Sequence, residues 1–117
     1  MALLLVVTLS CTHHETSVIQ QKRSPDGRST AYLESVEFGG GVDYISRVVI
    51  APSNEPFDKE DSGTWIYKSS DAAQPKSIAW RGNQRLDVIL SGSIDPDLAK
   101  IETRERNGVI PNLIFIK

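Results

Sequence analysis

Ser24-Pro25-Asp26-Gly27 lies between two β-rich runs, Val18–Arg23 and Ser29–Phe38, and is the clearest structural signal in the chain. Proline at the second position of a tight turn presets φ, and glycine at the fourth position tolerates the exit geometry. The two runs are therefore predicted to pair as a β-hairpin.

The same alternation of short β-rich runs and turn residues continues along the chain. Further runs rich in Val, Ile and aromatic residues are Asp43–Ala51, Thr64–Lys68, Ser77–Trp80 and Leu86–Leu90. Arg81-Gly82-Asn83-Gln84 separates the last two and predicts a second hairpin. In the run after this turn every second residue is apolar, as a half-buried strand requires. The core residues predicted here are Trp80, Leu86, Val88 and Leu90.

The last quarter of the chain allows two structures. Asn107-Gly108 is the strongest short hairpin signal, and it favours a hairpin between Lys100–Arg106 and Val109–Ile116. Asp95-Pro96 would instead cap a helix over Asp97–Arg106. The hairpin is preferred because the helical alternative lacks an apolar stripe at helical spacing.

Ser24-Pro25-Asp26-Gly27-Arg28, followed by Ala31-Tyr32-Leu33, resembles the Ser-Pro-Asp-Gly-Lys/Arg repeat of TolB-like β-propellers. In that family the turn joins neighbouring strands of a four-stranded blade. Ile78–Leu90 is a weaker echo of the same strand–turn–strand unit. The resemblance implies blade-like hairpins, and because the motif is a turn device it carries no chemistry. A closed propeller is excluded by length, since it needs at least four blades of about 40 residues.

The expected fold is mainly β: a single small antiparallel sheet of about six to eight short strands, in one domain spanning Ser17–Lys117. Pro111 places the last strand at a sheet edge or a bulge. The 117 residues suffice for one domain, and 39% hydrophobic residues suffice for its core. Cys11 is the only cysteine, so no intramolecular disulfide forms. A net charge of −2 offers no positive field for nucleic acid.

The first eleven residues, Met1–Cys11, form an uncharged apolar run that closes with Leu9-Ser10-Cys11. The run is too short to span a bilayer as a helix, which takes about 20 residues. It resembles the bacterial lipoprotein signal, whose lipobox ends in a small residue and a cysteine. The resemblance implies cleavage after Ser10, diacylglycerol on the Cys11 thiol and acylation, such as by palmitate, of the new amino terminus.

This organisation predicts a signal peptide over residues 1–10, a lipidated tether over residues 11–16 and the β domain after it. Cys11 then holds the protein in the bacterial cell envelope, on the periplasmic side of a membrane or at the outer membrane. The alternatives are a buried first strand or a start assigned at the wrong methionine, with an incidental cysteine.

The residue types needed for most catalytic and metal sites are missing from the predicted domain. No His or Cys lies between Glu15 and Lys117, which excludes a Ser-His-Asp or Cys-His site and a His/Cys zinc site there. His13 and His14 beside Cys11 have no further partners to complete a coordination sphere. No cofactor and no metal are therefore predicted.

Carboxylates and aromatic residues on the predicted strands are weaker candidates. Paired carboxylates for glycoside hydrolysis would come from Glu34, Glu37 and Asp43. Strand carboxylates are, however, expected to face solvent. An aromatic binding face would come from Trp65, Tyr67 and Trp80. Aromatic residues at alternating strand positions are more typical of a core.

Two loops depart from core-building sequence, the bend Gly39–Gly41 and the acidic loop Asn54–Gly63. The glycines are expected to supply a bend rather than a phosphate cradle, because no helix follows them. The acidic loop lacks the spacing of a calcium-binding loop. Loops on a rigid scaffold often carry binding residues, and the candidate contact residues are Asp58, Glu60 and Asp61.

The sequence therefore predicts a non-enzymatic, lipid-anchored envelope protein that acts by contact with a protein partner. One alternative is an immunity or inhibitor protein against an envelope-targeting enzyme or toxin. Another is a small hydrolase that depends on carboxylates.

Lipid on Cys11 is testable by intact-mass analysis of the protein expressed in a bacterium. The expected mass lacks residues 1–10 and carries acyl groups, because more than one acyl chain is needed for stable anchoring. Replacement of Cys11 by serine should move the protein out of the membrane fraction. Recovery of an unmodified chain that still begins at Met1 would contradict the lipoprotein hypothesis.

Overall fold

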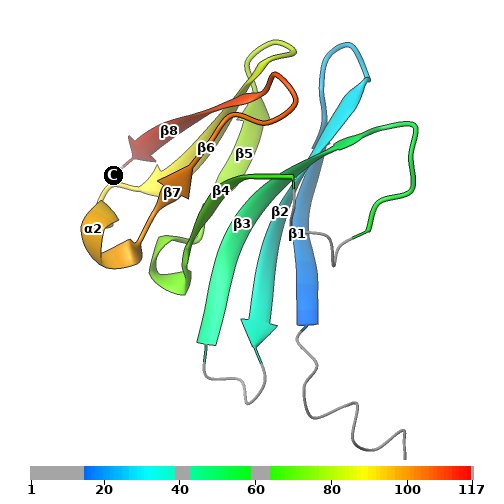
Figure 1. Cartoon of the computed structure of the whole chain (residues 1–117). Coiled ribbons are helices and arrows are strands. Elements are labelled where there is room, and N and C mark those ends of the chain that lie inside the picture. The colour runs from blue at the N-terminus through cyan, green and yellow to red at the C-terminus, as the bar shows by residue number, and fades with distance from the viewer. Residues whose placement is uncertain (1–14, 39–42, 59–63, 117) are drawn as a thin grey trace, which may run out of the picture.

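The computed structural model describes residues 15–38, 43–58 and 64–116, and the described chain is built mainly from β-strands (Figure 1). The strands are β1 (Glu15–Arg23), β2 (Ser29–Phe38), β3 (Asp43–Pro52), β4 (Trp65–Ser70), β5 (Ser77–Trp80), β6 (Arg85–Ser91), β7 (Glu102–Thr103) and β8 (Ile110–Ile116). The helical segments are η2 (Asp71–Ala73) and α2 (Pro96–Ala99). The predicted mainly β class, with about six to eight short strands, is confirmed.

The strands form two sheets rather than the single sheet expected. The larger sheet has the order β1-β2-β3-β4-β7, and all its neighbouring strands are antiparallel. The smaller sheet has the order β5-β6-β8. In it β6 and β8 run parallel, so the expectation of antiparallel pairing throughout was wrong for this pair. β8 is an edge strand, in agreement with the position predicted for Pro111.

The core lies between the two sheets. Alternate residues of the central strands of the larger sheet face inward and are buried: Ala31, Leu33, Val48 and Ile50. Opposite them lie Leu86, Val88 and Leu90 of β6, each fully buried as predicted. Trp80 is half-buried and packs at the border of this core. No disulfide supports the chain, so this apolar burial is the main source of stability.

Hydrogen bonds between β1 and β5 cover the β5 edge of the smaller sheet. The Gln20 side-chain amide donates to the Lys76 carbonyl at 3.2 Å, and its oxygen accepts from the Ile78 N–H at 3.2 Å. The Trp80 indole N–H donates to the Lys22 carbonyl at 2.9 Å. One glutamine side chain thus pairs with the backbone as a neighbouring strand would, and it holds the two sheets together at this edge.

Both early hairpin predictions are confirmed. β1 pairs with β2 across Ser24–Gly27, and β5 pairs with β6 across residues 81–84. β1 begins at Glu15, two residues before the domain start expected at Ser17. Cys11 and the predicted signal peptide lie outside the described residues. Within the described ranges, no helix is long and apolar enough to cross a membrane.

The structure corrects the prediction for the last quarter of the chain. Asn107 and Gly108 form a tight turn at φ 54° and 77°, and Arg106 and Val109 exchange backbone hydrogen bonds across it. The two arms then separate, because β7 pairs with β4 and β8 pairs with β6. The predicted hairpin is therefore wrong, although its turn is present.

The helical alternative is also only partly present. Asp95 caps α2 by accepting a hydrogen bond from the Asp97 N–H at 3.0 Å, with Pro96 at the first turn. The helix lasts four residues and ends at Lys100, whose left-handed φ of 55° stops it. Asp95 was therefore identified correctly as the cap, but the helix is shorter than the alternative over Asp97–Arg106 required.

Leu90→Ala tests the inter-sheet core. Leu90 is 0% exposed, so removal of its side chain should lower the free energy of unfolding by about 2–5 kcal/mol in chemical denaturation. Leu98→Ala is the matched control, because Leu98 is 78% exposed and should change stability by less than about 0.5 kcal/mol. Equal effects at the two positions would contradict this assignment of the core.

Candidate functional site: three turns flanked by arginine

Three tight turns gather at one end of the molecule, at the top of Figure 1. They are the β1–β2 turn at residues 24–27, the β5–β6 turn at residues 81–84 and the turn at residues 106–109. We call this region the turn end. Since the turns lie far apart in the sequence, only the pairing of the strands brings them together.

Ser24, Asp26 and Gly27 each have an identifiable structural role in the first turn. The Gly27 N–H donates to the Ser24 carbonyl at 2.9 Å, and Gly27 has a φ of +75° that a side chain would strain. The Asp26 carboxylate accepts from the Arg28 N–H at 3.0 Å and from the Ser24 hydroxyl at 2.7 Å. These two bonds lower the pKa of Asp26 below its ordinary value, and the bond from the Arg28 N–H contributes most. The turn is therefore well fixed at neutral pH.

Hydrogen bonds join the three turns into one platform. The Asp26 N–H donates to the side-chain oxygen of Asn83 at 2.9 Å and thereby links the first turn to the second. The Ile110 N–H donates to the Gln84 carbonyl at 2.8 Å and links the second turn to the third. The turn end is therefore held as a single surface, although its parts belong to two sheets.

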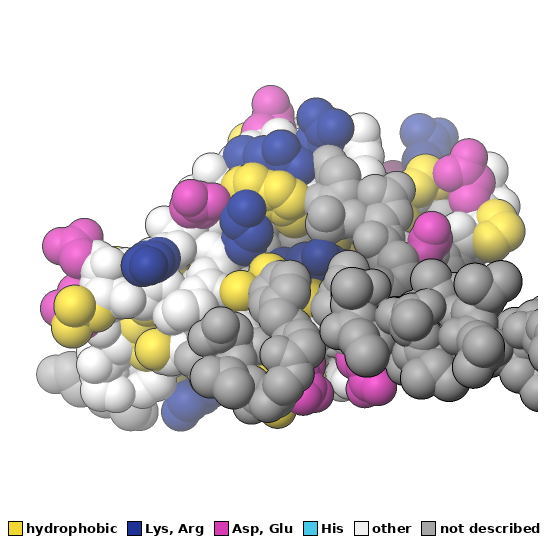
Figure 2. Space-filling model, turned by 60° about the horizontal axis from the view of Figure 1, so that its bottom comes forward, with side chains coloured by type: hydrophobic (Ala, Val, Ile, Leu, Met, Phe, Trp, Pro, Cys, Tyr) yellow, Lys and Arg dark blue, Asp and Glu magenta, His cyan; other side chains and the backbone are white. Residues whose placement is uncertain are grey.

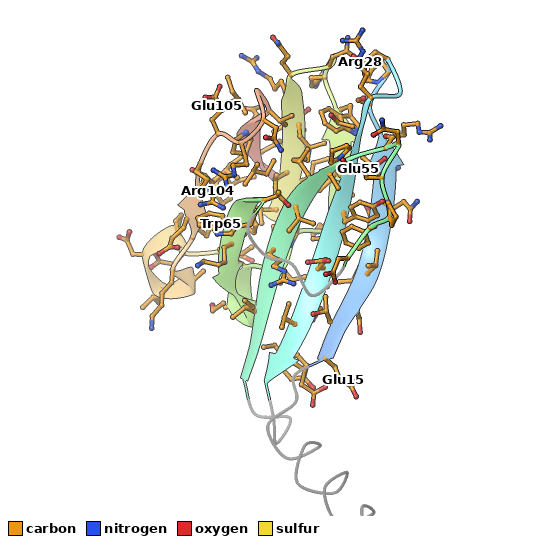
Figure 3. The ribbon with its side chains drawn as sticks, turned by 45° about the vertical axis from the view of Figure 1, so that its right-hand side comes forward. Glu15, Arg28, Glu55, Trp65, Arg104 and Glu105 are labelled. Atoms are coloured by element: carbon orange, nitrogen blue, oxygen red, sulfur yellow. The ribbon has the colours of Figure 1, made fainter. Side chains whose placement is uncertain are left out.

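Arginine flanks every turn. Arg28 follows the first, Arg81 and Arg85 bracket the second, and Arg106 opens the third. All four are exposed, and Figure 3 shows Arg28 at the top of the molecule. Two open hollows meet at Asp26. One, of about 530 Å³, is lined by Asp26, Arg81, Asn83, Gln84, Arg85 and Ile110, and the other, of about 450 Å³, by Asp26, Gly27, Arg28 and Asn54.

A buried carboxylate orients Arg81. Asp87 on β6 accepts from the Arg81 Nε–H at 2.6 Å and from the Asn112 side-chain amide at 3.0 Å. Burial raises the pKa of Asp87, but the bonds from Asn112 and Arg81 and the positive charges of Arg81 and Arg85 outweigh it, so the pKa is lowered. Asp87 therefore stays ionised at neutral pH and holds Arg81, whose side chain is still 68% exposed.

The carboxylate pair considered for hydrolysis does not form. Glu34 and Glu37 lie on opposite faces of β2, because they are an odd number of residues apart. Glu34 is fully buried and pairs with Arg47 across β2 and β3 at 2.5 Å. The expectation that it faces solvent was therefore wrong, since the ion pair compensates its burial. The side chain of Asp43 lies outside the described residues.

The three aromatic residues do not form a common binding face. Tyr67 is buried in the core, where its hydroxyl donates to the Ala73 carbonyl at 2.6 Å and burial raises its pKa. Trp65 lies on β4 beneath two cations, with the Arg104 guanidinium 4.0 Å and the Lys68 ammonium 4.7 Å from the ring centroid. Arg104 and Trp65 lie side by side in Figure 3.

Figure 2 shows acidic and basic side chains interspersed on another face of the molecule.

The acidic loop begins next to the turn end. The Ser53 N–H donates to the Arg28 carbonyl at 2.9 Å, and Asn54 lines a hollow with Arg28. The ring of Phe57 then stacks on Tyr32, with 3.6 Å between centroids.

The candidate contact residues of this loop are only partly described. Asp58 is exposed, whereas Glu60 and Asp61 lie outside the described residues, as does the bend Gly39–Gly41. Among the residues that the structure describes, no group of three or more His, Cys, Asp or Glu side chains is placed to hold a metal.

Sequence reasoning did not identify the arginine cluster. The available signal was that each of the three tight turns carries arginine at its border, whereas none carries lysine there. That signal becomes informative only when the turns are known to share one end of the molecule. No protein-family model, curated protein or solved structure matches the chain.

Asp87→Asn tests the clamp on Arg81. The pKa of Asp87 in the folded protein lies below its ordinary value of 3.8, so its stabilising effect is present above about pH 4 and is lost as pH falls through the folded-state pKa. The variant should lose about 1–3 kcal/mol of stability at pH 7 and show a shallower decline in acid. Glu105→Gln, at an exposed carboxylate, is the control. An unchanged acid limb in Asp87→Asn would contradict the clamp.

Proposed function

We propose that this chain is a lipid-anchored protein of the bacterial cell envelope that acts by contact with a protein partner rather than by catalysis. The contact surface is the turn end. Cys11 is the attachment point for the lipid.

The opposite positions of Glu15 and the turn end carry this proposal. β1 begins at Glu15, four residues after Cys11, and ends at Arg23 beside the first turn. Nine residues of strand span about 30 Å. Glu15 and Arg28 accordingly lie at opposite ends of the molecule in Figure 3. A lipid on Cys11 would leave the turn end facing away from the membrane, where a partner has access.

The chemistry of the turn end also favours binding. Its prominent side-chain groups are guanidinium and amide groups, which donate hydrogen bonds and do not act as bases near pH 7. They are held on turns that are hydrogen-bonded to one another, so the turns lose little conformational freedom when a partner binds. Arginine is, in addition, enriched in protein–protein interfaces.

The acidic loop is a second contact surface in this proposal. Its first residues adjoin Arg28, so one partner can reach both regions. Under the sequence-based hypothesis, replacement of Asp58, Glu60 and Asp61 by serine abolishes contact. Under the turn-end proposal, replacement of Arg28 and Arg85 does so.

Capture of partners from the native envelope with variants of each region separates these surfaces. The wild-type protein should retain one partner in a fixed ratio, and Arg28→Ser combined with Arg85→Ser should reduce its recovery by roughly tenfold. Neither side chain takes part in an ion pair found among the described residues, so the fold should persist with an unchanged melting temperature.

Full recovery with the double arginine variant would exclude the turn end as the contact surface. If the triple acidic variant alone loses the partner, contact is made by the acidic loop. A retained partner that is an envelope-degrading enzyme, inhibited at a one-to-one ratio, would identify the protein as an inhibitor.

A further inference from the structure

We propose that the turn end is a carboxylate-binding site whose ligand is an acidic segment of a protein. This inference rests on the proposed function in its choice of surface, and it adds the chemistry of the partner. The occupant is recognised through aspartate and glutamate side chains that accept hydrogen bonds from the turn arginines, Arg28, Arg81, Arg85 and Arg106.

The charges at the turn end are arranged so that positive groups face outward. Asp87 is buried beneath Arg81, and the Asp26 carboxylate is occupied by the Ser24 hydroxyl and the Arg28 N–H. Arg28, Arg85 and Arg106 take part in none of the ion pairs found in the described parts of the chain. Two exposed carboxylates partly offset them: Asp26, which lines both hollows, and Glu105, next to Arg106. The four arginines therefore outnumber the three carboxylates Asp26, Asp87 and Glu105, and basic charge is in slight excess at this end of a chain whose net charge is −2.

Arg81 is oriented in advance for a second carboxylate. Asp87 engages its Nε–H, and the side chain is 68% exposed. The two terminal guanidinium nitrogens carry four further N–H groups in one plane, and such a fork matches the two oxygens of a carboxylate. Arg85 lines the same hollow, so two guanidinium groups border one site.

The neighbouring side chains favour a protein segment over a free phosphate. The hollow that holds Arg81 and Arg85 is also lined by two amide side chains, Asn83 and Gln84, and by Ile110, which is 47% exposed. Amides pair with a peptide backbone, and an exposed isoleucine gives an apolar contact. Phosphate oxygens would accept hydrogen bonds from the arginines and the amides, but they would leave the exposed Ile110 without a contact.

Binding of poly-L-glutamate to the full-length protein, purified in a neutral detergent, tests the site, with polyphosphate of matched charge as the second probe. Arg28→Ser combined with Arg85→Ser should weaken poly-L-glutamate binding at least tenfold. Lys76→Ser combined with Lys100→Ser is the control, because it removes the same charge from two exposed lysines elsewhere. This control should weaken binding less than about twofold at 0.15 M salt.

The conservative variant tests the geometry of recognition. Arg28→Lys combined with Arg85→Lys keeps the charge and removes the planar fork, so it should still lose several-fold in affinity. Unchanged binding in the arginine-to-serine variant, or an equal loss in the lysine control, would overturn the site. Tighter binding of polyphosphate than of poly-L-glutamate would overturn the carboxylate assignment. This binding test depends neither on the lipid nor on partner capture, so failure of the carboxylate site and failure of the proposed function are distinguishable.

Discussion

The structure depends on apolar burial between two sheets that no disulfide joins. The inward residues of β2 and β3 meet those of β6, and these side chains are almost fully excluded from water. At roughly 1.5–3 kcal/mol for each large apolar side chain, such burial outweighs the other contacts described. The hydrogen bonds of Gln20 and Trp80 between β1 and β5 then fix how the sheets meet at one edge.

The positions of the turns follow from this packing. β2 and β6 present their apolar sides to each other because the hairpins containing them lie in facing layers. β1 and β5 run in the same direction where Gln20 and Lys22 bond to β5, so the turns that follow these strands reach the same end. The parallel pairing of β8 with β6 brings the third turn to that end as well. Cross-links at Asn83 and Gln84 complete the platform. The functional proposals therefore rest on the inter-sheet core.

Local sequence patterns predicted the features that depend on neighbouring residues, namely turns, strand alternation and a helix cap. Gly27 and Gly108 mark turns that exist, alternation in β6 identified its buried side, and Asp95 was correctly recognised as a cap. The partition into two sheets could not be predicted in this way. Asn107-Gly108 favours a turn in either arrangement, but whether its arms pair depends on which distant strand offers each arm a better partner.

The same distinction between local and long-range interactions applies to the candidate site. The role of Ser24–Gly27 as a turn was readable from residue types, because proline and glycine restrict or permit particular backbone angles. The meeting of Arg28 with Arg81 and Arg85 was not readable, since it depends on long-range pairing. Glu34 was expected in solvent because strand carboxylates usually face water. Its burial could not be predicted, since it is compensated by Arg47 on a different strand. Side chains that depend on distant partners are thus the ones that sequence patterns describe least well.

Hydrogen–deuterium exchange of the membrane-anchored protein, with and without its captured partner, tests the central claim most directly. If contact is made at the turn end, binding should slow exchange in the segments around residues 24–28, 81–85 and 106–110, and should leave the β1 segment that begins at Glu15 unchanged. Slowed exchange confined to the start of β1, with the three turns unaffected, would contradict the account.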